Sequence, residues 1–181
     1  MTDSRIAALK ADAAALVASN PAFARAAAVA GDFAVALRPP GFGTLLYIIL
    51  EQQVSIKAAA AMWRRLNDAC APLTPTAFLR LDDDALRQCG FSRQKVAYGR
   101  GLARALIDRT IDLDGVADLD DEAAIATLSA LKGIGRWSAE CYLLWALGRR
   151  DVMPAADLGL MVGWQWLTGA AERPTPDELR A

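Results

Sequence analysis

The chain has 181 residues, of which 54% are hydrophobic and 23% are charged, and its formal net charge is −1. This is enough for one domain or two small lobes with a buried core, and the charge alone does not indicate a nucleic-acid-binding protein. Because the sequence contains no histidine, it cannot form Ser-His or Cys-His nucleophile pairs and a catalytic zinc site is not expected, so carboxylates would have to do the charge work of an enzyme.

Every segment of the chain is predicted to be helical, because alanine, leucine and arginine dominate and strands with alternating polarity are essentially absent. Capping residues and prolines mark the helix starts. In chain order we first predict a helical region that begins at Asn20-Pro21 and is stopped by residues 39–41. Four helices follow: over 42–54, over 56–69 with Ser55 as the cap, from Thr74-Pro75, and from residues 82–84 to Gly90. The last four run from Ser92 to about Arg109, from residues 120–122 to about Ala130, over 136–147, and from Asp157 towards Leu167.

The sequence predicts neither a membrane span nor a signal peptide nor a disulfide framework. No window offers the roughly 18 uninterrupted apolar residues that a membrane span requires. Charged residues interrupt the segment from Met1 to Leu16, so no signal peptide is predicted and a cytoplasmic location is the default expectation. The three cysteines, Cys70, Cys89 and Cys141, are far apart and odd in number, which favours free buried thiols over a disulfide framework.

A turn with two glycines separates the helices predicted before and after it. It consists of Lys132, Gly133, Ile134 and Gly135. Glycines at these positions allow a positive φ and leave backbone N–H groups uncovered, and the next helix points its positive end at the same place. The turn is therefore a candidate phosphate site that needs few cations. A plain helix-helix turn is the alternative; a dinucleotide fingerprint is excluded because Ser138 replaces its third glycine and no strand precedes it.

Three blocks of sequence give this pattern a family resemblance. Residues 50–59 contain Gln-Gln-Val-Ser, residues 89–95 contain Gly-Phe-Ser-Arg-Gln-Lys, and Asp157 follows the glycine turn after a helix and a loop that contains Pro154. Together they resemble the helix-hairpin-helix/Gly-Pro-Asp superfamily of DNA glycosylases, and within it the 3-methyladenine DNA glycosylase II family. The blocks span roughly residues 40 to 165, which is most of the chain.

The resemblance implies an all-α, two-lobed DNA glycosylase fold with a helix-hairpin-helix motif. It implies a single domain over residues 1–181, with one lobe at about 41–150 and the other built from the termini. The form is compact and lacks the β-rich N-terminal domain of longer relatives. Relatives also continue beyond the helix that residues 174–178 begin, so we expect a C-terminal continuation, and pocket residues from it cannot be assigned.

The resemblance also assigns roles to residues. Asp157 matches the catalytic carboxylate, and Gln53 matches the side chain that wedges into the base stack. Trp137 occupies the position where lyase-competent relatives carry a Schiff-base lysine, which implies a monofunctional enzyme. The DNA-binding residues are then Gln53, Lys132, Gly133, Ile134, Gly135, Arg136 and Ser138. The backbone carbonyls of Ser129, Leu131 and Gly133 would hold a monovalent cation, Na⁺ or K⁺. The cysteine quartet of an iron-sulfur cluster is missing.

The implied reaction suits these residues. Extruding a nucleotide costs a few kcal/mol, and cleavage of its glycosidic bond builds positive charge on the sugar, which a carboxylate at Asp157 can stabilise. Asp157 also has a structural reading, as the cap of its helix. A base such as 3-methyladenine is already cationic and leaves without a general acid. Aromatic faces would attract it, and the base-pocket candidates are Trp137, Tyr47 and Tyr142.

The sequence therefore predicts a monomeric, nucleoid-associated enzyme of base excision repair that acts on alkylated purines in double-stranded DNA. Three alternatives stay open: a non-catalytic module that binds duplex DNA, a bifunctional glycosylase/lyase, and a helical scaffold for protein partners. The sequence does not fix which lesions are accepted, whether 3-methyladenine, 7-methylguanine or hypoxanthine.

Overall fold

The computed structural model describes residues 2–31 and 37–181, and within these ranges it contains helices and no strand. The all-α prediction is confirmed. The part of the predicted helical region that covers residues 32–36 lies outside the described residues. Within the described part of the chain, no helix is both long enough and apolar enough to span a membrane.

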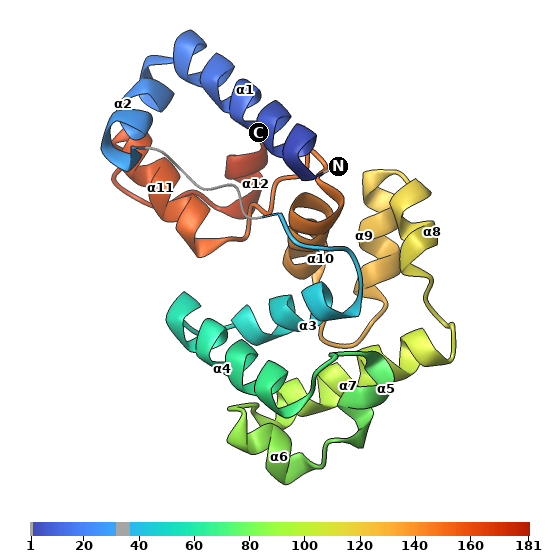
Figure 1. Cartoon of the computed structure of the whole chain (residues 1–181). Helices are drawn as coiled ribbons and strands as arrows, with labels where there is room; N and C mark the ends of the chain where they lie inside the picture. The colour runs from blue at the N-terminus through green and yellow to red at the C-terminus, as the bar shows by residue number, and fades with distance from the viewer. Residues whose placement is uncertain (1, 32–36) are drawn as a thin grey trace. The chain divides into compact units, whose positions relative to one another are not determined.

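The chain divides into two compact units, one formed by residues 1–37 with 148–181 and the other by residues 38–147. Each unit is described by itself (Figure 1). The first unit contains α1 (Thr2–Ser19), α2 (Pro21–Ala30), α11 (Leu158–Thr168) and α12 (Pro176–Arg180). The second unit contains α3 (Phe42–Glu51), α4 (Ile56–Ala69), α5 (Pro75–Arg80), α6 (Asp83–Gln88), α7 (Arg93–Ile107), α8 (Leu113–Asp118), α9 (Asp121–Ser129), α10 (Arg136–Tyr142) and the π-helical turn η1 (Leu143–Leu147).

In the first unit, α2 packs against both α1 and α11. Asn20 caps α2 by accepting a hydrogen bond from the Ala22 N–H at 2.9 Å, as its sequence predicts. The Arg25 guanidinium donates to the Leu167 carbonyl at 3.0 Å and so ties α2 to α11. Thr175 and Glu178 form a reciprocal capping box that starts α12.

Helix α3 is the centre of the second unit. Eight of its ten residues are buried, because an apolar helix with no polar face can only be stable inside a core. It packs against α4, α7 and α10, and Figure 1 shows it between α4 and α10. The helix ends at Glu51 rather than at Val54 as predicted, since Gln53 has a left-handed φ of 56° that no α-helix accepts.

The other predicted helix starts are largely confirmed. Each capping side chain accepts a hydrogen bond from a backbone N–H of the first turn, which satisfies a group that has no partner within the helix. The caps are Ser55, Thr74, Asp82, Ser92, Asp120 and Asp157. The helix predicted over 136–147 is continuous, but its second half is the π-helical turn η1, whose Trp145 carbonyl accepts from the Arg38 N–H at 2.9 Å.

Helix α7 is close to both α3 and α5 because residue 99 is a glycine. A Cβ at Gly99 would lie 2.8 Å from the Phe78 ring and 3.0 Å from Leu46, and both of these side chains are completely buried. Gly101 lies on the same helix, where a Cβ would meet nothing within 4 Å. The two glycines therefore separate the effect of packing from that of helix propensity.

We predict opposite effects on stability for the two alanine substitutions. Gly101→Ala should raise the unfolding free energy by about 0.5–1 kcal/mol, because alanine favours the helix and restricts the unfolded chain. Gly99→Ala carries the same propensity gain but overpacks the core, and should lower it by about 1–2 kcal/mol net. Urea unfolding of both variants is the measurement. Equal stabilisation by the two substitutions would contradict the close α5–α7 packing.

Candidate functional site

The first element of the candidate site is the turn of residues 52–55 between α3 and α4, called here the Gln53 loop. Gln53 is exposed and has a φ of 56°, a conformation that costs a non-glycine residue about 1 kcal/mol or more. Ser55 ends the loop, and its hydroxyl accepts from the Ala58 N–H at 3.2 Å. The loop therefore turns the Gln53 side chain out of the unit, where it is accessible to a partner.

The second element is the turn of residues 132–135 between α9 and α10, called here the glycine hairpin. Its turn is closed by a hydrogen bond from the Ile134 N–H to the Leu131 carbonyl at 3.0 Å. Gly133 has the predicted positive φ, 95°. Gly135 does not use the positive φ that a glycine allows: its φ is −89°, which any residue can adopt. Lys132 is exposed and Ile134 is buried.

Gly133 and Gly135 are glycines for different reasons. A Cβ on Gly133 would lie 2.3 Å from the Tyr98 ring, so both the conformation and the packing exclude a side chain there. A Cβ on Gly135 would meet nothing within 4 Å, and no side chain caps the helix that begins after it. The start of α10 is therefore open to an approaching group, with backbone N–H groups that have no partner within the helix.

Gln52 joins the two elements, although it is not among the site residues that the sequence predicts. Its side-chain amide donates to the Gly133 carbonyl at 2.8 Å and to the Ser138 hydroxyl at 3.0 Å. These partners are 81 and 86 residues away in the sequence, so no local pattern could reveal the contact. Ser138 is 2% exposed, so its side chain, predicted to contact DNA, is engaged inside the protein.

Lys95, the lysine of the third sequence block, supports the Gln53 loop from below. Its ammonium donates to the Leu50 carbonyl, in the last turn of α3, at 2.6 Å, and the residue is 8% exposed. Burial lowers the pKa of Lys95 from its ordinary value of 10.5. A cation at this place stabilises the negative end of α3.

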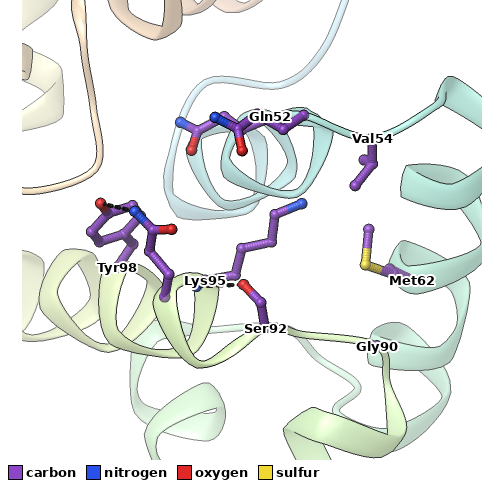
Figure 2. A pocket seen from close by; sticks show the side chains of 9 residues that line it. Gln52, Val54, Met62, Gly90, Ser92, Lys95 and Tyr98 are labelled. Carbon is purple, nitrogen blue, oxygen red and sulfur yellow. Dashed lines mark hydrogen bonds between the residues drawn. The ribbon is translucent and has the colours of Figure 1, made fainter.

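A cavity of about 260 Å³ lies between the Gln53 loop and α7. Figure 2 shows Lys95 rising from α7 towards the end of α3, with Tyr98 one turn further along the same helix. The lining residues are Gln52, Gln53, Val54, Met62, Gly90, Ser92, Gln94, Lys95 and Tyr98.

Arg136, predicted to bind DNA, is held by two carboxylates. Its guanidinium donates to both oxygens of Glu122 at 2.5 and 2.9 Å, and to Glu140 at 2.8 Å. Glu140 is 2% exposed. The hydrogen bonds to Glu122 raise the pKa of Arg136, and the hydrogen bond to Glu140 raises it further. The positive charge is therefore largely compensated within the protein, and Arg136 fixes the start of α10 against α9.

The three predicted base-pocket aromatics differ in accessibility. Tyr142 is completely buried and its hydroxyl accepts from the Gly41 N–H at 2.9 Å, so it has no exposed ring face for a base; burial raises its pKa. Tyr47 is 5% exposed. The Arg38 guanidinium lies 3.6 Å from the centre of the Tyr47 ring, and the Trp63 ring packs in an edge arrangement with 5.2 Å between the two ring centres. Burial, followed by the charge of the neighbouring Glu51, raises the pKa of Tyr47. Only Trp137, in the first turn of α10, is partly exposed.

Of the carbonyls predicted to hold a cation, that of Ser129 is at the end of α9, that of Leu131 directly precedes the glycine hairpin, and that of Gly133 lies in it. The Leu131 oxygen accepts from the Ile134 N–H, and the Gly133 oxygen accepts from Gln52. A carbonyl oxygen has two lone pairs, so each can still bind a cation. In residues 2–31 and 37–181 no cluster of acidic side chains and cysteines offers a metal site. The three cysteines are free and buried, as predicted.

Asp157 belongs to the other unit, where it caps α11. Its carboxylate accepts from the Leu160 N–H at 3.1 Å, and its own N–H donates to the Pro154 carbonyl at 2.8 Å. The structural reading of this residue is therefore confirmed. The side chain is partly exposed, so capping leaves room for a second role.

Comparisons with known proteins agree with this arrangement. Residues 46–181 match the model of the HhH-GPD superfamily of base excision DNA repair proteins. A protein of Schizosaccharomyces pombe named DNA-3-methyladenine glycosylase 1 is 36% identical over 136 residues, which cover 72% of this chain and 59% of that protein. The chain therefore spans less than two thirds of the length of this relative.

Two solved structures show the same fold. A 3-methyladenine DNA glycosylase of Schizosaccharomyces pombe in complex with abasic DNA superposes with a TM-score of 0.81 at 29% identity, over 90% of this chain and 82% of that one. A DNA-3-methyladenine glycosidase from Bacillus halodurans gives a TM-score of 0.71 at 34% identity, over 91% and 76% of the two chains.

The hairpin geometry predicts unequal effects for its two glycines. Gly133→Ala should lower the unfolding free energy by about 2 kcal/mol or more, because it combines a strained φ with a clash against Tyr98. Gly135→Ala should change it by less than about 0.5 kcal/mol, since the site is open. Denaturant unfolding of the pair is the measurement, and an equally stable Gly133→Ala variant would show that the turn is not closed as described.

The buried ammonium of Lys95 predicts a pH dependence of stability. Between its lowered pKa in the folded state and 10.5, the unfolded chain binds more protons than the folded one, so stability rises with pH across this window. Lys95→Met removes the effect. We expect the wild-type chain to gain unfolding free energy relative to Lys95→Met as the pH rises from neutral towards 10.5. A constant difference, measured by urea unfolding, would mean that the Lys95 pKa is not lowered.

Proposed function

Because the chain belongs to the HhH-GPD superfamily of base excision DNA repair proteins, we propose that it is a monofunctional DNA glycosylase that removes alkylated purines such as 3-methyladenine from duplex DNA. The observation that carries the proposal is the outward-turned Gln53, on a loop that Gln52 ties, in one unit, to a hairpin whose following helix has no side-chain cap. The names of the relatives support the substrate class.

Binding relies on the backbone more than on cations. The backbone N–H groups in the first turn of α10, which no side chain caps, donate to a phosphate, and the exposed Lys132 adds a positive charge beside them. Since Arg136 is compensated by Glu122 and Glu140, its side chain contributes little to this contact. A net charge of −1 is compatible with such a mode, because helix-terminal N–H groups carry partial positive charge without any cationic side chain.

Gln53 fills the gap that the extruded nucleotide leaves in the stack. Its exposed position on a strained turn gives it the reach to enter a duplex, and its amide can hydrogen-bond the orphaned base. The strain is stored in the free protein and so adds nothing to the cost of binding.

Asp157 acts on the sugar of the extruded nucleotide. As the bond between the base and the sugar breaks, positive charge develops at the anomeric carbon, and an ionised carboxylate beside it stabilises that state and orients the attacking water. A cationic alkylated purine needs no general acid to leave, which suits a chain without histidine. Trp137, the partly exposed candidate aromatic, can stack on such a base.

Two further features complete the proposal. Trp137 stands where a lyase would need a lysine amine, so no Schiff base forms with the sugar and the reaction stops at an abasic site. The carbonyls of Ser129, Leu131 and Gly133 would hold a monovalent cation, Na⁺ or K⁺, which would supply positive charge for a DNA phosphate. The protein acts as a monomer on double-stranded DNA.

The test is base release by the Asp157→Asn variant. Asparagine caps helices as well as aspartate does, so α11 is kept while the charge is lost. We expect release of methylated bases from alkylated duplex DNA, measured by chromatography, to fall by about a hundredfold or more, with affinity for a duplex containing an abasic site retained. Asp118→Asn, at the exposed end of α8, is the control and should behave as wild type.

Each other outcome selects an alternative. Unchanged release by Asp157→Asn would remove the mechanism. Wild-type protein that binds duplex DNA but releases no base would be a non-catalytic module, and strand breaks with a borohydride-trapped adduct would show a lyase.

A further inference from the structure

The Gln52 side chain lies between the Gln53 loop and the glycine hairpin, and the function proposed above does not use it. We propose that Gln52 is a positioning residue that fixes the Gln53 loop on the glycine hairpin. The hairpin that binds a phosphate and the Gln53 side chain that is inserted then keep a fixed position relative to each other. This inference rests on the proposed function, and it assigns Gln52 no contact with DNA.

Gln52 and Gln53 are consecutive residues whose backbones differ sharply. Gln52 has φ −59° and ψ 124°, and Gln53 has φ 56°. Gln52 reaches the hairpin inside the unit, whereas Gln53 is exposed. Since one peptide bond joins them, the contact made by Gln52 sets the height and direction from which Gln53 leaves the surface.

The hydrogen bonds of the Gln52 amide are long-range in sequence, and both end on groups that are packed inside the unit. The amide donates to Gly133, which is packed against Tyr98, and to Ser138, which is 2% exposed. The Gly133 carbonyl can only accept a hydrogen bond, so this contact needs a donor at position 52. Gln52 thus joins two turns that are 81 residues apart in the sequence.

One face of α7 supports both the Gln53 loop and the glycine hairpin. Lys95 donates to the Leu50 carbonyl beneath the Gln53 loop, and Tyr98, three residues later, packs against Gly133. Residues three apart lie on the same side of a helix. Figure 2 shows Lys95 and Tyr98 on this face of α7, with Gln52 above them in the view. The Gln53 loop is thus held by Gln52 on one side and by Lys95 on the other.

The experiment is a double-mutant cycle of Gln52→Ala and Gln53→Ala. Two readouts are used: single-turnover base release from methylated duplex DNA, and fluorescence of a 2-aminopurine beside an abasic-site analogue, which reports unstacking and needs no catalysis. We expect Gln52→Ala alone to lower both the release rate and the unstacking equilibrium by about tenfold. In the Gln53→Ala background the same change should have an effect of less than about twofold, because a residue that acts through Gln53 has nothing left to position.

Two variants separate positioning from a loss of folding. Gln52→Glu is nearly isosteric but has no donor for the Gly133 carbonyl, and should impair both readouts at least as much as Gln52→Ala. Gln88→Ala, an exposed glutamine in the last turn of α6, should match wild type. Thermal unfolding is followed for all variants, and an effect due only to lost stability would persist in the Gln53→Ala background.

Equal effects of Gln52→Ala in both backgrounds, or full function of Gln52→Glu, would overturn the inference. If wild-type protein released no base, the proposed function would fail, and the fluorescence cycle would still decide the role of Gln52. A wild-type chain without affinity for DNA would overturn both.

Discussion

The hydrogen bond from the Gln52 amide to the Gly133 carbonyl, 2.8 Å long, is the interaction on which the candidate site depends. It requires that the chain leave α3 after Glu51, which forces Gln53 into its left-handed turn. It also requires that the hairpin stand close to α7, which only a glycine at residue 133 allows. The sequence Gln-Gln and the sequence Gly-Ile-Gly are thus two halves of one structural unit, although 81 residues separate Gln52 from Gly133.

Two cations of the second unit stabilise its internal structure. Lys95 stabilises the end of α3, and Arg136, which pairs with Glu140 on its own helix, joins α10 to α9 through Glu122. At the glycine hairpin, the first turn of α10 and the exposed Lys132 are available to an anionic partner. A phosphate bound in this way contacts backbone groups that are already fixed, so little conformational entropy is lost on binding. This explains how a chain with net charge −1 can belong to a DNA repair superfamily.

The parts of the structure that the sequence predicts are those that local physics controls. Caps such as Ser55 and Asp157 satisfy a backbone N–H within one turn, so their neighbours in the sequence are enough to identify them. Burial is decided by partners far along the chain, and here prediction fails. Tyr142 is in the core and Arg136 is paired with Glu122, which lies 14 residues away on another helix. The end of α3 was misplaced because no residue type marks the left-handed turn at Gln53.

The most direct test of this account is a crystal structure of the chain with duplex DNA that contains an abasic-site analogue. The account predicts that the Gln53 side chain lies between base pairs at the abasic position, that backbone N–H groups of residues 135–137 contact a phosphate, and that the hydrogen bond between Gln52 and Gly133 is kept. It also predicts that the Asp157 carboxylate faces the abasic sugar. DNA bound with Gln53 outside the duplex, or with Asp157 turned away from the sugar, would contradict it.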